Sequence, residues 1–146
     1  MPAFSFELPG SDGRPIRGDL HLPDHDAGTA PGVVVAVHGF KGFRNWGFWP
    51  EFAHAFTAAG LAFVRYDASH NGVGHAGLEF DEEELFSRNT FAREDHDLAA
   101  VIDALGRRVL PGSDTLDPSR LALFGHSRGG GLAIVHASGD PRVRAV

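Results

Sequence analysis

A serine between two glycines at a fixed spacing is the pattern in this sequence with the clearest chemical meaning. Residues 125–129 (GHSRG) follow an apolar strand-like run and precede a helix-like run, the context in which G-x-S-x-G forms a nucleophile elbow. So tight a turn forces Ser127 into a strained backbone conformation and leaves no room for side chains at Gly125 and Gly129. The helix N-terminus and the N–H group of Arg128 then favour a developing oxyanion. The pattern predicts a serine nucleophile; a plain helix N-cap serine is the alternative.

A second glycine-containing loop supports the same interpretation. Residues 38–42 (HGFKG) stand at the end of the apolar run 32–38, and ligands bind at the carboxyl ends of the strands of a parallel sheet. An oxyanion hole needs a second N–H donor from a loop of this kind. We expect the backbone N–H groups of Phe40 and Arg128 to form the hole, although an ordinary strand-to-helix turn would contain similar residues.

Alternating strand-like and helix-like segments are expected to position these residues. A nearly continuous β-branched run at 32–38 is typical of a strand buried on both faces. Further strand-like runs occur at 61–67, 120–124 and, just beginning, 143–146. Helical spacing of apolar residues occurs at 49–59, 98–109 and 128–138. Two short alternating runs, 4–8 and 16–22, flank a turn-rich spacer and predict a hairpin. The order predicts an α/β fold: a mostly parallel sheet covered by helices and preceded by an N-terminal β-hairpin.

Other aromatic and histidine residues fall close to the predicted site. Trp46, Phe48 and Trp49 either pack a helix onto the sheet or wall an acyl pocket, and we favour packing. His70 and His75 lie in the glycine-rich loop after the second buried strand. We expect them to be exposed loop histidines rather than residues that line the mouth of the site.

Composition excludes several other classes of function. The chain has 146 residues, of which 42% are hydrophobic and 22% charged, as in a globular domain. A net charge of −6 argues against nucleic acid or an anionic membrane as partner. Cysteine is absent, which excludes disulfides and thiolate chemistry. No apolar run approaches the roughly 18 residues of a membrane helix, and no signal-peptide pattern is visible, so we expect a cytoplasmic protein.

Two cofactor alternatives have weaker support. Residues 72–77 (GVGHAG) match G-x-G-x-x-G, but the first glycine comes five residues after Asp67, and the acidic stretch 79–84 follows where a pyrophosphate would lie. Nine histidines suggest a metal, yet none has the spacing of a zinc site. We therefore expect neither a dinucleotide nor a metal cofactor.

Three segments, VVVAVHGFKGFRNW, LAFVRYDASHNGVG and LALFGHSRGGGLAI, resemble the α/β-hydrolase superfamily in order and spacing. The HGF loop and the GHSRGG elbow are most similar to its dienelactone-hydrolase-like and cinnamoyl-esterase-like branches, and less similar to prolyl-oligopeptidase-type domains. The resemblance implies a serine hydrolase that cleaves esters of small molecules through an acyl-enzyme on Ser127, with Phe40 and Arg128 as backbone donors. An acyl-peptidase or a thioesterase of the same fold is a minor alternative. Serine at position 127 departs from true dienelactone hydrolases, whose nucleophile is cysteine, so their substrate is not implied.

The resemblance also implies a triad acid and a triad histidine, which the family places after later strands. After Ser127 the chain offers only Asp140 and His136, which we expect to lie too far along the next helix, and we expect His126 and His38 to point elsewhere.

We therefore expect residues 1–146 to be the N-terminal portion of a single α/β-hydrolase domain, interrupted before the strands that carry the acid and the histidine. Such a portion is predicted to be inactive alone. The alternative is a non-catalytic protein of the same fold that binds a ligand or a second subunit, with a homo-oligomer as one form, because its last strand leaves an open sheet edge.

Overall fold

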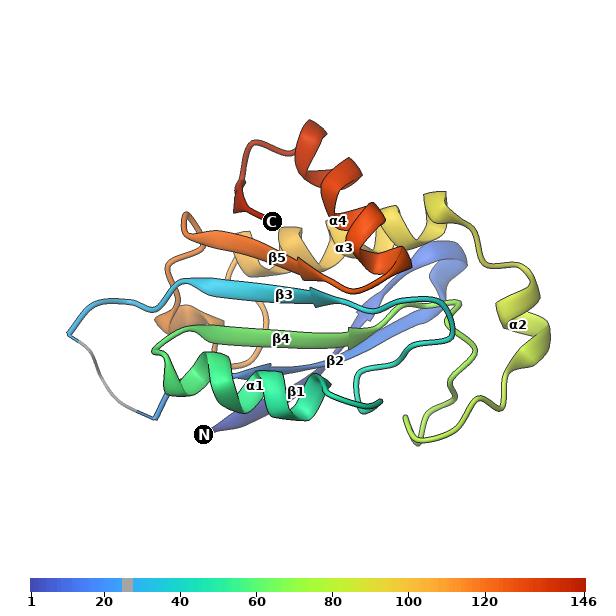
Figure 1. Ribbon diagram of the computed structural model, residues 1–146, viewed down its shortest axis with the longest axis horizontal. Helices are drawn as coiled ribbons and strands as arrows, with labels where there is room; N and C mark the ends of the chain where they lie inside the picture. Colours follow the sequence, from blue (N-terminus) through green and yellow to red (C-terminus); the bar gives the residue numbers. More distant parts are fainter. Residues whose placement is uncertain (25–27) are drawn as a thin grey trace.

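A six-stranded mixed sheet forms the centre of the computed structural model, which describes residues 1–24 and 28–146 (Figure 1). The strands are β1 (Ala3–Pro9), β2 (Pro15–His21), β3 (Val33–Val37), β4 (Ala62–Asp67), β5 (Leu121–Gly125) and β6 (Val143–Ala145). Their order in the sheet is β1-β2-β4-β3-β5-β6. The β1–β2 hairpin is antiparallel and joins β4 antiparallel, whereas β4, β3, β5 and β6 run parallel. The predicted α/β fold, with a hairpin before a mostly parallel sheet, is confirmed.

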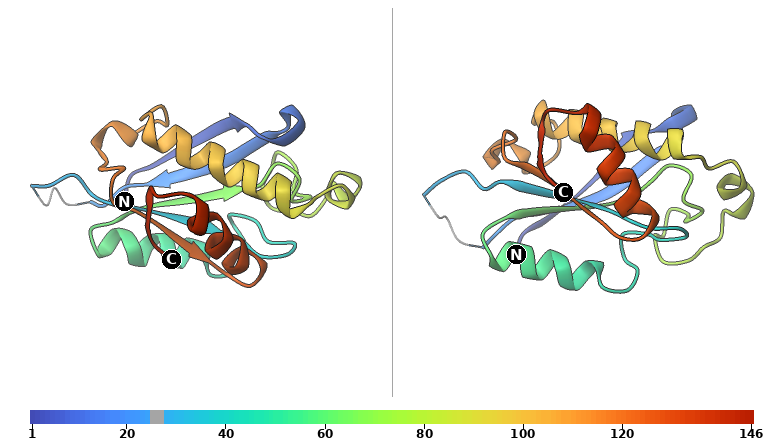
Figure 2. Two further views of the ribbon diagram at one scale, coloured as in Figure 1. Left: turned by 90° about the horizontal axis from the view of Figure 1, so that it is seen from above. Right: turned by 45° about the horizontal axis from the view of Figure 1, so that its top comes forward.

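Helices cover both faces of the sheet because each parallel connection needs a crossover. The crossovers contain α1 (Trp49–Ala58) after β3, α3 (Phe91–Gly106) before β5 and α4 (Arg128–Gly139) after β5. The right-hand view of Figure 2 shows α1 on one face and α3 with α4 on the other. Every residue of β3 and β4 is buried, which explains the apolar sequence of β3 and of the first half of β4.

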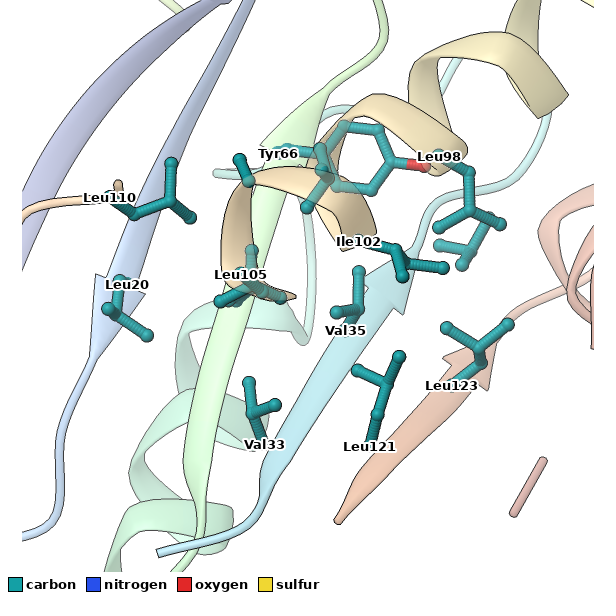
Figure 3. Close-up of a cluster of buried hydrophobic side chains, with 14 of the residues drawn as sticks. Leu20, Val33, Val35, Tyr66, Leu98, Ile102, Leu105, Leu110, Leu121 and Leu123 are labelled. Carbon is teal, nitrogen blue, oxygen red and sulfur yellow. The ribbon is translucent and has the colours of Figure 1, made fainter. Parts of the chain in front are cut away.

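The main hydrophobic core lies between the sheet and α3 (Figure 3). Leu98, Ile102 and Leu105 of α3 are at most 2% exposed and pack over Val35 and Tyr66. Burying a Leu or Ile side chain of this kind contributes about 1.5–3 kcal/mol. A smaller cluster, centred on buried Trp49, Ala53 and Phe63, holds α1 against the opposite face. The two cores fix β3 and β5, the strands that precede the predicted chemical loops.

Helix α3 begins and ends earlier than the apolar spacing predicts. Thr90 caps it by accepting a hydrogen bond from the N–H of Arg93 (3.2 Å). The chain leaves the helix after Gly106, and Arg108 takes a left-handed φ of 56°. Val109, which the spacing places on the buried face, is therefore 57% exposed. The acidic stretch forms a further short helix, α2 (Glu83–Ser87). No helix within the described ranges is long and apolar enough to cross a membrane.

Candidate active site

Ser127 occupies the turn between β5 and α4 in a strained conformation. Its φ of 55° and ψ of −123° belong to the first central position of a type II′ turn, which glycine normally fills. The Ser127 carbonyl accepts hydrogen bonds from the N–H groups of Gly130 (3.0 Å) and Gly131 (3.3 Å), so α4 starts immediately. The hydroxyl does not cap the helix, which argues against the role of a plain N-cap.

The two flanking glycines are required by close backbone contacts. A Cβ atom on Gly125 would lie 2.5 Å from the carbonyl oxygen of Gly129, and a Cβ on Gly129 would overlap the carbonyl oxygens of Val37 and His38. The carbonyl of Val37 also accepts a hydrogen bond from the N–H of His126 (3.2 Å). The elbow is thus packed directly against the end of β3, as expected for G-x-S-x-G in this context.

The loop after β3 lies against the serine. A Cβ on Gly39 would be 3.2 Å from the Cβ of Ser127 and 3.1 Å from the carbonyl oxygen of His126. Within the described part of the chain, the N–H groups of Phe40 and Arg128 donate no hydrogen bond to a protein acceptor. N–H groups without a protein acceptor beside a serine can donate hydrogen bonds to an oxyanion.

His38 fixes this loop to the neighbouring strand. Its Nε2 accepts a hydrogen bond from the N–H of Ala68 (3.2 Å), so the proton of the neutral ring is on Nδ1, which lies 3.0 Å from the carbonyl oxygen of Gly39. Both ring nitrogens are therefore engaged, and His38 is not available as a base for Ser127.

A small hollow of about 180 Å³ opens over Ser127. Its wall is formed by the residues Gly39, Phe40, Lys41, Gly42, Trp46 and His126. Trp46 is 46% exposed and lines the hollow, whereas Trp49 is 1% exposed and packs α1 onto the sheet. The preference for packing is thus right for Trp49 and wrong for Trp46, because Trp46 precedes the helix and lies on the loop. A larger hollow, of about 620 Å³, is lined by Gly32, Leu61 and Leu121 at the amino ends of the strands, the end opposite to ligand sites of α/β sheets.

An ion-pair network anchors the segment that carries Trp46. The carboxylate of Asp67, at the end of β4, accepts hydrogen bonds from the backbone N–H of Arg44 and from its Nη1, both at 2.7 Å. Arg44 Nε also lies 3.2 Å from Asp19. Burial raises the pKa of Asp67, and its contacts with Arg44 oppose that rise.

A second arginine extends the network. Arg65 donates a hydrogen bond from Nη1 to the carbonyl of Arg44 (2.7 Å) and another from Nε to Nε2 of His21 (3.0 Å). Burial, helped by the positive charge of Arg65, lowers the pKa of His21 to about 4. Asn45 continues the chain of contacts by donating to the carbonyl of Gly77 (3.0 Å). The Trp46 segment is thereby tied to β2, β4 and the glycine-rich loop.

The histidines considered as bases in the chain are engaged elsewhere. His136 contacts Asp95 (2.7 Å) and Asp140 (3.3 Å) at the far end of α4. The His126 ring packs edge-on against Phe48, with centroids 4.9 Å apart. Within residues 1–24 and 28–146, no hydrogen bond to the Ser127 hydroxyl is formed by a histidine or an acid.

The backbone of the glycine-rich loop after β4 is hydrogen-bonded by the acidic segment that follows it. The N–H of Gly74 donates to the carboxylate of Asp81 (2.7 Å), which places a negative charge where a pyrophosphate would bind. His75 is exposed, as expected. His70 is not: it is 2% exposed and contacts Ser69 Oγ (2.8 Å), and burial lowers its pKa. Among the described residues, no group of three or more His, Cys, Asp or Glu is arranged to hold a metal.

Two buried acids near the site were not found by the sequence analysis. Asp97 accepts hydrogen bonds from Ser11 N (2.8 Å) and Ser69 N (2.7 Å) and so joins the hairpin turn, α3 and the end of β4. Glu94 pairs with Arg128. Both acids belong to the first two turns of α3. Their acidity is itself a signal for a helix start, as is Thr90 as a possible N-cap, but neither signal predicts what the two side chains contact.

Comparison with known proteins shows the family of the chain. The acetyl xylan esterase (AXE1) family matches residues 2–146. Hydrolase LUC6 from Fusarium sp is 33% identical over 143 residues, which cover 96% of this chain and 31% of that protein. An uncharacterized 31.7 kDa protein from the traX-finO intergenic region of Escherichia coli is 33% identical over 114 residues, 78% of this chain and 35% of that protein. The chain thus spans about a third of the length of these curated relatives.

Solved structures give the same fold. The α/β hydrolase GrgF from Penicillium sp. sh18 superposes with a TM-score of 0.76 at 20% identity, over 99% of this chain and 45% of that protein. Dienelactone hydrolase from Anabaena variabilis gives a TM-score of 0.72 at 23% identity, over 97% of this chain and 59% of that protein. Together with the match over residues 2–146, these similarities show that the chain belongs to the acetyl xylan esterase (AXE1) family of α/β-hydrolases.

Proposed function

We propose that the full-length protein containing this chain is a serine esterase with Ser127 as its nucleophile. The observation that carries the proposal is a strained Ser127, whose hydroxyl does not cap α4, beside the backbone N–H groups of Phe40 and Arg128, which have no protein acceptor among residues 1–24 and 28–146. Membership of an esterase family supports the reaction class. The triad acid and histidine are proposed to come from sequence beyond residue 146, because the candidate histidines inside the chain are engaged elsewhere.

The proposed reaction follows from this geometry. Ser127 Oγ attacks the acyl carbon of the ester while its proton passes to the histidine. The carbonyl oxygen becomes an oxyanion and accepts hydrogen bonds from the N–H groups of Phe40 and Arg128. Collapse expels the alcohol, which takes the proton from the histidine, and leaves an acyl group on Ser127. Water then attacks this acyl-enzyme in the same way and releases the carboxylic acid.

The proposed substrates are esters of small molecules. The family description makes acetyl esters the first class to test. A neighbour of the same fold, Est1E from Butyrivibrio proteoclasticus, was solved with ferulic acid bound, so a feruloyl ester is the bulkier comparison.

The test is ester turnover by the full-length protein and by its Ser127→Ala variant. We expect the wild type to hydrolyse p-nitrophenyl acetate and the variant to lose on the order of 10⁶ in kcat. A fluorophosphonate should add its phosphonyl mass to the peptide that contains Ser127. Equal turnover by both proteins, or labelling at another residue, would refute the assignment of the nucleophile. A wild type that binds short acyl esters without cleaving them would instead support the non-catalytic alternative.

A further inference from the structure

An ion pair between helices reaches the residue next to the serine. Glu94, in the first turn of α3, is 7% exposed, and its carboxylate lies 3.0 Å and 3.3 Å from Nε of Arg128. The same carboxylate accepts a hydrogen bond from Nδ2 of Asn89 (2.7 Å). Contacts with both Asn89 and Arg128 fix the orientation of the nearly buried Glu94 carboxylate, which can therefore hold the Arg128 side chain in one position.

The guanidinium of Arg128 is held from a second side as well. Its central carbon lies 3.6 Å from the ring centroid of Phe91, within the range of a cation–π contact. The residue that supplies a proposed oxyanion donor is therefore fixed at both ends, by its place in the elbow and by the contacts of its side chain with α3. We infer that Glu94 is a positioning residue, which aligns the N–H of Arg128 with the oxyanion by holding the Arg128 side chain on α3.

This inference rests on the proposed function. It predicts that loss of the Glu94 charge lowers kcat, whereas electrostatics alone predicts a rise. By electrostatics alone, loss of the Glu94 charge would leave the positive charge of Arg128 without its counter-charge. The potential at the oxyanion would become more positive, and the reaction would be faster. Loss of positioning should slow it, because a misplacement of about 1 Å at a reacting centre can cost on the order of 100-fold. Glu94→Gln keeps the size of the side chain and removes its charge, so the direction of the change in kcat separates the two effects.

The experiment compares Glu94→Gln with Asp95→Asn in the full-length protein. Asp95 is the next residue of α3 and also pairs with α4, but through His136 at the far end of the helix. We expect Glu94→Gln to lower kcat for p-nitrophenyl acetate by about 10- to 100-fold with little change in KM, and Asp95→Asn to leave kcat unchanged. Equal losses in both variants, or a higher kcat in Glu94→Gln, would overturn the inference.

Arg128→Met tests the same contact from the other partner and remains informative if Glu94→Gln does not fold. It keeps the backbone N–H and removes the guanidinium, so we expect a similar loss in kcat. The double variant should then be no slower than either single variant, because both remove one interaction. Additive losses would overturn the inference. Failure of the proposed function has a different signature, since Ser127→Ala would then be as active as the wild type.

Discussion

Gly129→Ala and Gly131→Ala differ by two positions in the same helix and should change stability in opposite directions. A methyl group on Gly129 would overlap the carbonyl oxygens of Val37 and His38, whereas a Cβ on Gly131 meets nothing within 4 Å. The oxygens of Val37 and His38 stand at the end of β3, where Val37 is paired with Gly125 of β5, and the strand before them is paired with both β4 and β5. The start of α4 must therefore move.

The size of each effect follows from these contacts. Forced overpacking costs up to about 3 kcal/mol, and the replacement of a helical glycine by alanine returns about 1 kcal/mol, so Gly129→Ala should lose about 2 kcal/mol. Gly131→Ala should gain up to about 1 kcal/mol. At about 2–4 °C per kcal/mol, the melting temperature should fall by about 4–8 °C in the first variant and rise by about 2–4 °C in the second.

Thermal unfolding followed by far-UV circular dichroism, with urea unfolding as a second measurement, tests the pair. Gly131→Ala serves as the matched control, because it makes the same chemical change in the same helix without a steric contact. A Gly129→Ala protein as stable as the wild type would refute the claim that the elbow is packed against β3 without room for a side chain.

Two further predictions concern pH and the oxyanion hole. The pKa of His21 is lowered to about 4, so between about pH 6.5 and pH 4 the unfolded chain binds a proton that the folded chain does not. Its contribution should destabilise the fold progressively as the pH falls through this window, by up to about 3 kcal/mol. His21→Gln should flatten that part of the unfolding free energy measured in urea at each pH, and an unchanged slope would contradict the assignment. At Phe40, substitution by proline removes the N–H and should lower kcat by about 10²–10³-fold. Phe40→Ala keeps the N–H and should change kcat by less than about tenfold; similar losses in both variants would assign the effect to the ring.

Short-range features were the ones that the sequence could predict. The elbow at Ser127 depends on five consecutive residues, so its backbone could be predicted from a local pattern. The contact that requires Gly129, with the carbonyl oxygens of Val37 and His38, lies between distant segments. The buried strand β3 was predictable because its unbroken apolar residues suit only a strand covered on both faces. In β4 only the first three residues are apolar, and the burial of Arg65 and Asp67 depends on ion pairs that the pattern does not show.

Features that depend on packing between distant segments were not predictable. Glu94 and Arg128 are 34 positions apart and Arg44 and Asp67 are 23 apart, so no local pattern connects them. Trp46 and Trp49 are alike as residues, and only the start of α1 at Trp49 separates a pocket wall from a core residue. Val109 was misplaced because the left-handed turn at Arg108 has no glycine to signal it.

The conformation of Ser127 sets stability and activity against each other at one position. A non-glycine residue with φ of 55° and ψ of −123° carries a cost of about 1–3 kcal/mol that glycine would largely avoid. A library of variants selected only for resistance to heat would therefore tend to accumulate glycine at position 127 and discard the hydroxyl. Engineering of this fold for stability should hold that codon fixed and seek its gains in open helical positions such as Gly131.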